Sequence, residues 1–245
     1  EITIQSVRGR MLDDDIGYLR ITQFQEQTAN DQKKVLSELK EKGMKSLIID
    51  LRNNPGGLLS AAVGATEQFI PPGKLVVSIK NRQGKRDEYH ANAGDPLTDI
   101  PIIVLVNAGS ASGSEILAGA LQDWGRAVIV GTQTFGKGSV QTMLPLSDGS
   151  GLRLTTAKYF TPDDRSIHGT GITPNIKVEG VPVLPHPEAE NVGKPKAPSI
   201  TEEKADVDET SEEKEQRLID KDVYIQKAIE LLKTWDVFRA ITPHT

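Results

Sequence analysis

Three short runs of apolar residues, each bounded by turn-forming residues, constrain the fold of this chain more than any other feature. They are SLIIDL at 46–51, PIIVLV at 101–106 and AVIVG at 127–131. Runs of this length without polar alternation are typical of strands buried on both faces, as in a parallel sheet. Helices are expected at 30–42, where apolar residues have helical spacing, at 58–69, and at 115–124, where good helix formers dominate. This order of strands and helices predicts an α/β core with a largely parallel sheet.

The pattern of a folded core fades near residue 180, so we expect one domain over 1–180. Residues 181–217 are rich in proline and then in acidic side chains, which predicts a flexible, solvated linker. A C-terminal helix is expected over 218–240, where apolar residues approximate one helical face. These are Ile219, Val223, Ile225, Ile229, Leu232 and Trp235. We expect this helix to pack either on the core or on a second copy of the chain in a homodimer.

Composition excludes several functional classes. The 245 residues carry a formal net charge of −5, so no basic surface is expected to attract nucleic acid. No apolar run approaches the roughly 20 residues of a membrane-spanning helix, so the chain is not expected to be transmembrane. Cysteine is absent, which excludes thiol nucleophiles and thiolate metal sites. The sequence also lacks H-E-x-x-H and the glycine-rich nucleotide-binding motifs, so neither a metal nor a cofactor is expected.

A serine-rich segment, VNAGSASGSEILAGAL at 106–121, is the first candidate for chemistry. It places small residues between a buried strand and a helix that begins near Ser114, where exposed amides suit a developing oxyanion. Ser112 and Glu115 also have the spacing of a helix capping box, which is the more common role for such a serine. Ser110 and Ser114 are equally good candidates by composition, so the segment alone does not identify a nucleophile.

Two further segments contain candidate partners for such a serine. VGTQTFGKGSVQ at 130–141 sets Lys137 between glycines. A partly buried lysine can act as a neutral base, whereas a solvated one is an ordinary loop residue. On a helical or tightly wound segment, Gln141 would lie four residues away and could orient the lysine. In IIDLRNNPGGLL at 48–59, Gly56 and Gly57 form either an ordinary turn or a source of oxyanion-binding amides.

Taken in order with GYLRITQF at 17–24 and LTTAKYFTPDDRSIHGTGITPNI at 154–176, these segments resemble the C-terminal processing peptidases. These enzymes, also called tail-specific proteases, belong to the S41 family of serine peptidases. The resemblance implies a ClpP/crotonase-like α/β core built from repeated strand–helix units. It also implies a serine–lysine dyad, and the family's spacing selects Ser112 as nucleophile and Lys137 as base.

The same resemblance assigns the remaining site residues. Gln141 would position Lys137, and the oxyanion would be held by the amide of Gly113 together with that of Gly56 or Gly57. Family members commonly have alanine after the nucleophile, and glycine at this position loosens the turn by roughly 0.5–1 kcal/mol. They also carry a PDZ domain, of which this chain shows no recognisable segment. The resemblance therefore implies a core without PDZ-dependent regulation.

The implied activity is endoproteolysis near the C-terminal ends of polypeptide substrates, through an acyl-enzyme and without a cofactor or metal. Family members are exported, so a periplasmic or cell-envelope location is expected. Two alternatives stay open at this point. One is a non-catalytic scaffold that binds peptides, and the other is an acyl-CoA enzyme of crotonase type that uses the same oxyanion geometry.

Overall fold

The computed structural model describes residues 5–13, 15–92, 94–147, 149–178 and 221–241, with only the main chain described at 142 and 236–241. The predicted linker at 181–217 lies outside these residues. The helices are α1 (Thr28–Glu41), α2 (Leu59–Thr66), α3 (Gly113–Asp123) and α5 (Val223–Ile241). The strands are β1 (Val7–Met11), β2 (Ile16–Ile21), β3 (Ser46–Asp50), β4 (Leu75–Asn81), β5 (Arg86–His90), β6 (Ile102–Val106), β7 (Val128–Gly131), β8 (Ser139–Pro145), β9 (Gly151–Phe160) and β10 (Ile176–Lys177).

Within the described residues, a six-stranded sheet has the order β1-β2-β3-β6-β7-β10. The pairs β2–β3, β3–β6, β6–β7 and β7–β10 are parallel, and only β1 runs antiparallel to its neighbour. Each of the three apolar runs forms one of the central strands, β3, β6 or β7. The prediction of an α/β core with buried parallel strands is therefore confirmed.

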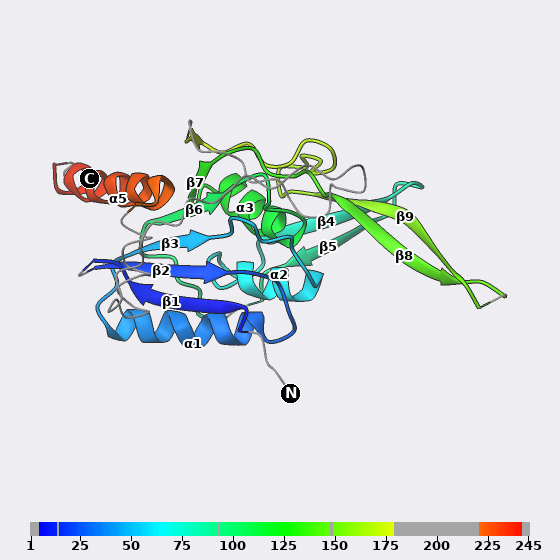
Figure 1. Ribbon diagram of the computed structural model, residues 1–245, viewed down its shortest axis with the longest axis horizontal. Coiled ribbons are helices and arrows are strands. Elements are labelled where there is room, and N and C mark those ends of the chain that lie inside the picture. Colours follow the sequence, from blue (N-terminus) through cyan, green and yellow to red (C-terminus); the bar gives the residue numbers. More distant parts are fainter. Residues whose placement is uncertain (1–4, 14, 93, 148, 179–220, 242–245) are drawn as a thin grey trace, which may run out of the picture.

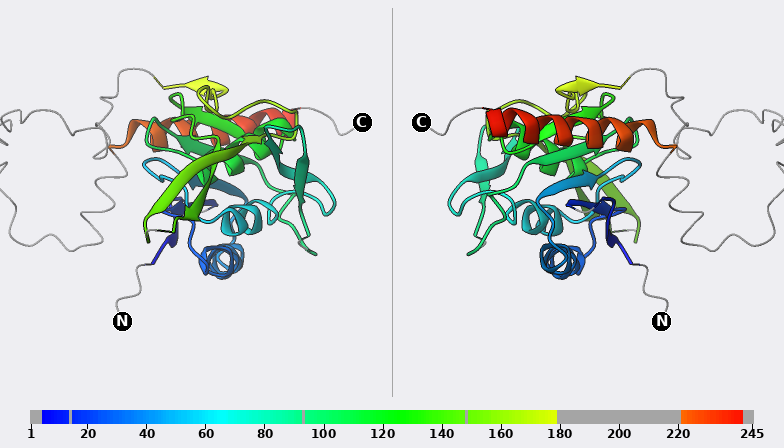
Figure 2. Two further views of the ribbon diagram at one scale, coloured as in Figure 1. Left: turned by 90° about the vertical axis from the view of Figure 1, so that its right-hand side faces the viewer. Right: turned by 90° about the vertical axis from the view of Figure 1, so that its left-hand side faces the viewer.

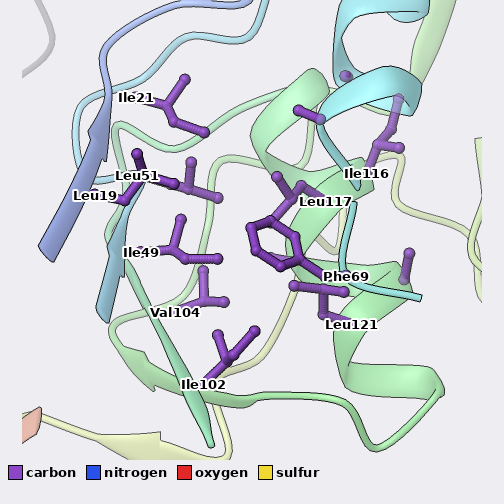
Figure 3. Close-up of a cluster of buried hydrophobic side chains, with 14 of the residues drawn as sticks. Leu19, Ile21, Ile49, Leu51, Phe69, Ile102, Val104, Ile116, Leu117 and Leu121 are labelled. Atoms are coloured by element: carbon purple, nitrogen blue, oxygen red, sulfur yellow. The ribbon is translucent and has the colours of Figure 1, made fainter. Parts of the chain in front are cut away.

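Side chains that alternate along the central strands form two separate apolar cores. Leu19, Ile49 and Val104 point to one face of the sheet, which α1, α2 and α3 cover. Figure 3 shows the part of this core where Phe69 and the apolar side of α3 meet the sheet. Ile48 and Leu105 point to the opposite face. The alternation follows from strand geometry, in which successive side chains leave opposite faces.

Helix α5 covers the second face of the sheet, on the side opposite to α1 (Figure 2). It packs through Tyr224, Ile225, Ala228 and Leu232. The apolar face expected from the sequence was partly wrong, because Val223 and Trp235 are each 56% exposed, while Ile219 lies outside the described residues. Burial instead follows the spacing i, i+1, i+4 and i+8, which keeps a single stripe of a straight helix against the sheet.

A second sheet has the order β5-β4-β9-β8 within the described residues. Its β8–β9 hairpin projects away from the rest of the molecule (Figure 1). Strand β8 begins two residues after Lys137, so this hairpin leaves the body close to the candidate site. In the described part of the chain, no helix has both the length and the apolar character required to span a bilayer.

Candidate active site

The three candidate serines at the junction of β6 and α3 differ in what their hydroxyl groups bind. Ser110 is fully buried, and its hydroxyl donates to the carbonyl of Leu51 at 2.8 Å. Ser114 is also fully buried and donates to the carbonyl of Asn54 at 2.9 Å. Both hydroxyls therefore tie this turn to the end of β3. Ser112 lies between them and is only partly buried, which makes it the serine with access to a ligand.

Ser112 has a strained backbone conformation, with φ 54° and ψ −109°. It forms the expected capping box with Glu115 at the start of α3. An ordinary N-cap residue adopts the β region, and positive φ is costly for a residue with a Cβ atom. Capping alone therefore does not account for this geometry. The conformation is that of a sharp strand-to-helix elbow that presents the serine side chain.

The turn after β3 packs directly against the Ser112 elbow. A Cβ atom built on Gly56 would lie 2.6 Å from Cβ of Ser112 and 2.8 Å from the amide nitrogen of Gly113. The N–H of Gly56 donates to Oδ1 of Asn54 at 2.9 Å, so it is already paired. The N–H groups of Gly57 and Gly113 have no hydrogen-bond partner among the described residues. Of the two glycines left open by the sequence, Gly57 therefore has the available donor.

Glu115 connects the serine elbow to the segment that carries Lys137. Its Oε2 accepts the backbone N–H of Ser112 at 2.8 Å and that of Lys137 at 2.9 Å. Its Oε1 accepts the hydroxyl of Thr134 at 2.6 Å and the N–H of Gly136 at 2.7 Å. Burial raises the pKa of the Glu115 carboxyl above its usual value, although these hydrogen bonds act in the opposite direction.

The glycines on either side of Lys137 allow close packing against the H-G-T-G turn at 168–171. A Cβ atom on Gly138 would overlap the backbone of His168, and one on Gly136 would lie 3.2 Å from backbone atoms of Gly169 and Gly171. The N–H of Gly169 also donates to the carbonyl of Gly136 at 2.9 Å. The lysine segment is therefore fixed by its backbone on both sides.

The side chains of Lys137 and Gln141 differ from the sequence-based expectation. Lys137 is exposed rather than partly buried, and its amino group has no ion-pair or hydrogen-bond partner in the described part of the chain. Gln141 is exposed on β8, so the helical spacing that would bring it to Lys137 does not apply. Strand β8 begins only at Ser139 and its register shifts between Val140 and Gln141, so residues 137–141 form neither a helix nor a regular strand. The assigned role of Gln141 stays a prediction.

Sequence analysis missed two contacts that shape this site. Glu115 was recognised only as a capping residue, because its bonds to Thr134, Gly136 and Lys137 join segments distant in sequence. The second contact is that of Phe24, a buried core residue whose ring would lie 2.8 Å from a Cβ atom on Gly113. Among the residues that the structure describes, no three His, Asp or Glu side chains gather as a metal-binding group.

The sequence matches the model of Peptidase family S41 over residues 15–178, which include the serine elbow, the glycine turn and the lysine segment. This chain belongs to peptidase family S41. It is 48% identical over 182 residues to an S41 relative from Bartonella bacilliformis named carboxy-terminal-processing protease. A carboxyl-terminal-processing protease of Synechocystis is 48% identical over 164 residues.

The solved structure of a photosystem II D1 C-terminal processing protease is similar to this S41 chain, with a TM-score of 0.68 and 37% identity. That match covers 72% of this chain and 49% of the other. The sequence matches cover 73% and 67% of this chain, but only 42% and 38% of the Bartonella and Synechocystis proteins. The chain therefore spans less than half the length of these relatives.

Proposed function

We propose that this chain contains the catalytic core of a serine endopeptidase that cleaves polypeptides near their C-terminal ends. The observation that carries the proposal is the strained Ser112 elbow, whose backbone shares the Glu115 carboxylate with the backbone of Lys137. The names of the S41 relatives support the assignment to C-terminal processing.

In the proposed reaction, the hydroxyl oxygen of Ser112 attacks the substrate carbonyl and the amine of Lys137 accepts the hydroxyl proton. The amides of Gly113 and Gly57 stabilise the oxyanion. The proton then passes to the leaving amine, and water hydrolyses the resulting acyl-enzyme. Gln141 is proposed to orient the lysine side chain from the start of the β8–β9 hairpin.

The exposure of Lys137 has a consequence for this scheme. A lysine acts as a base only as the neutral amine, and burial favours the neutral form. Because Lys137 is exposed here, we propose that the bound polypeptide itself excludes water from the amine. Substrate binding and activation of the base would then occur together.

The test is incubation of the chain with casein, followed by mass spectrometry of the products. We expect cleavage by the parent chain and none by the Ser112→Ala and Lys137→Ala variants. Lys85→Ala, at an exposed position in the turn between β4 and β5, serves as the matched control and should cleave like the parent. Full activity of Lys137→Ala would contradict the dyad, and a parent chain without activity would contradict the proposal for this chain.

A further inference from the structure

A buried cluster of charges lies at the end of β3, on the face of the sheet that α5 covers. Asp50 is fully buried and accepts hydrogen bonds from the Tyr18 hydroxyl at 2.7 Å and from Arg20 at 2.6 Å. Arg52 donates to the same carboxylate through Nε at 3.0 Å, Nη2 at 2.7 Å and its backbone N–H at 2.9 Å. A buried carboxylate with this many donors holds its partners in a defined geometry.

Arg52 also binds a residue 170 positions later in the chain. Its Nη1 donates to Oδ1 of Asp222 at 2.8 Å, and its Nη2 lies 2.8 Å from Oδ2. The guanidinium lies over the ring of Tyr224, 4.9 Å from the ring centre. Arg52 is therefore held between the end of β3 and the first turn of α5, with its planar group fully engaged.

Asp222 is itself fixed by the helix that follows it. Its Oδ1 accepts the backbone N–H groups of Tyr224 at 3.0 Å and Ile225 at 3.2 Å, as a helix N-cap does. Tyr224 and Ile225 are buried against the sheet. The carboxylate is thus anchored to the docked end of α5, and its position depends on that docking.

Arg52 is the first residue of the turn that carries the candidate oxyanion glycines. The next residue, Asn53, has φ 57°, and Gly56 has φ 97°. Two hydrogen bonds hold the turn. The N–H of Asn53 donates to Oδ1 of Asn107, and the side-chain amide of Asn54 donates to the carbonyl of Ile21. A strained turn of this kind persists only when its surroundings determine it, and Arg52 fixes its starting point.

We propose that Asp222 is a positioning residue that holds the Asn53–Gly57 turn in its catalytic conformation through Arg52. The inference rests on the proposed function, because it takes this turn as the source of an oxyanion-binding amide. Helix α5 then belongs to the catalytic unit, although it follows the segment matched to the S41 family. Asp222 touches no reacting atom and acts only through Arg52.

The test separates the ion pair of Asp222 from its capping role. Asp222→Asn keeps a capping side chain but removes the charge that pairs with Arg52. Asp222→Glu keeps the charge and is the rescue variant. The matched control is Lys233→Ala, which breaks an ion pair between α5 and the loop after β1, to Asp13 at 2.7 Å. Hydrogen exchange by mass spectrometry over residues 53–57 and the kinetics of peptide hydrolysis are measured on all four chains.

For Asp222→Asn we expect exchange in the turn to rise about tenfold and kcat to fall about tenfold with KM little changed, as for loss of a charged hydrogen bond. Lys233→Ala should leave both unchanged, and Asp222→Glu should restore part of each. Unchanged exchange in Asp222→Asn, or an equal change in Lys233→Ala, would overturn the inference. A third outcome separates the two proposals. If exchange is faster only in Asp222→Asn but the parent chain itself shows no peptidase activity, the coupling is supported and the proposed function is refuted.

Discussion

The backbone N–H groups of Ser112 and Lys137 donate to the same carboxylate oxygen, Oε2 of Glu115. One carboxylate oxygen therefore holds the backbones of the proposed nucleophile and base, independently of the contacts of their own side chains. Because Glu115 is fully buried, water cannot replace it as the acceptor for these donors.

The Glu115→Gln substitution should lower both the stability of the fold and the catalytic rate. Glutamine offers one acceptor oxygen, so its NH₂ group would face either the N–H groups of Ser112 and Lys137 or the donors of Thr134 and Gly136. We expect the free energy of unfolding to fall by about 2–4 kcal/mol and kcat to fall at least about tenfold. Denaturant unfolding and peptide hydrolysis measure the two effects. Glu67→Gln is the control, since among the described residues Glu67 accepts one backbone N–H, from Asn92, which glutamine can still accept.

Gly56→Ala tests the close approach of the glycine turn to the serine elbow. The new Cβ atom would lie 2.6 Å from Cβ of Ser112, and alanine disfavours φ 97°. Gly73→Ala shares the positive φ, at 81°, but its Cβ atom meets nothing within 4 Å. We expect Gly73→Ala to lose about 1–2 kcal/mol of stability with normal activity. Gly56→Ala should lose more and react more slowly with a fluorophosphonate probe of Ser112. Equal behaviour of the two variants would show that the contact does not matter.

Gly113→Ala should be destabilising here, although alanine is common at this position in the family. The added Cβ atom would lie 2.8 Å from the Phe24 ring and 3.2 Å from Cβ of Ala62. We expect a loss of about 1–3 kcal/mol, as for other overpacked cores. Phe24→Leu should relieve the contact, so the double variant should be more stable than the sum of the single losses indicates. A double-mutant cycle by denaturant unfolding measures this coupling, and strict additivity would argue against it.

Acid should destabilise the fold through Asp50. Burial acts to raise the pKa of this carboxyl, but the hydrogen bonds and charge of Arg52, with the charge of Arg20, outweigh it and hold the pKa below its usual value. The folded state therefore binds the proton more weakly than the unfolded state. The resulting stabilisation is complete above the unfolded pKa of about 3.9 and is lost as the pH falls toward the folded pKa. Thermal unfolding is measured from about pH 6 down to about pH 2. The melting temperature should fall more steeply with pH for the parent than for Asp50→Asn. Identical slopes would contradict this assignment.

The central sheet could be predicted from the sequence because its strands are buried on both faces. SLIID and IIVLV contain few polar residues, so their burial is visible in composition alone. Helix α3 was predicted from Glu115 onward and begins two residues earlier, at Gly113, because Ser112 caps it. Strand burial and helix capping depend on residues that are close together in the chain, so both can be predicted from short segments of the sequence.

The contacts that assemble the candidate site could not be predicted in the same way. Glu115 and Lys137 are 22 residues apart, and Arg52 and Asp222 are 170 apart, so neither pair forms a local pattern. The apolar run around Asp50 indicates that the strand is buried, but the sequence does not identify Arg20 and Arg52 as the partners that neutralise this carboxylate. Gln141 lies on β8 rather than on the helical segment that residue spacing alone would require, and its role, which the family resemblance implies, stays a prediction.

Helix α5 follows every strand of the sheet that it covers, and this affects the order in which these elements can assemble during synthesis. All residues of the proposed dyad and both described sheets precede Val178, and the helix that covers Ile48, Ile103 and Leu105 is translated after them. A nascent chain emerges from its N-terminus, so the sheet has one apolar face open to water until α5 leaves the ribosome. Arg52 also lacks Asp222 during this interval. The side chains of the proposed dyad thus emerge before the helix that completes the support of Arg52, so under the proposals above full activity would have to wait until α5 has docked.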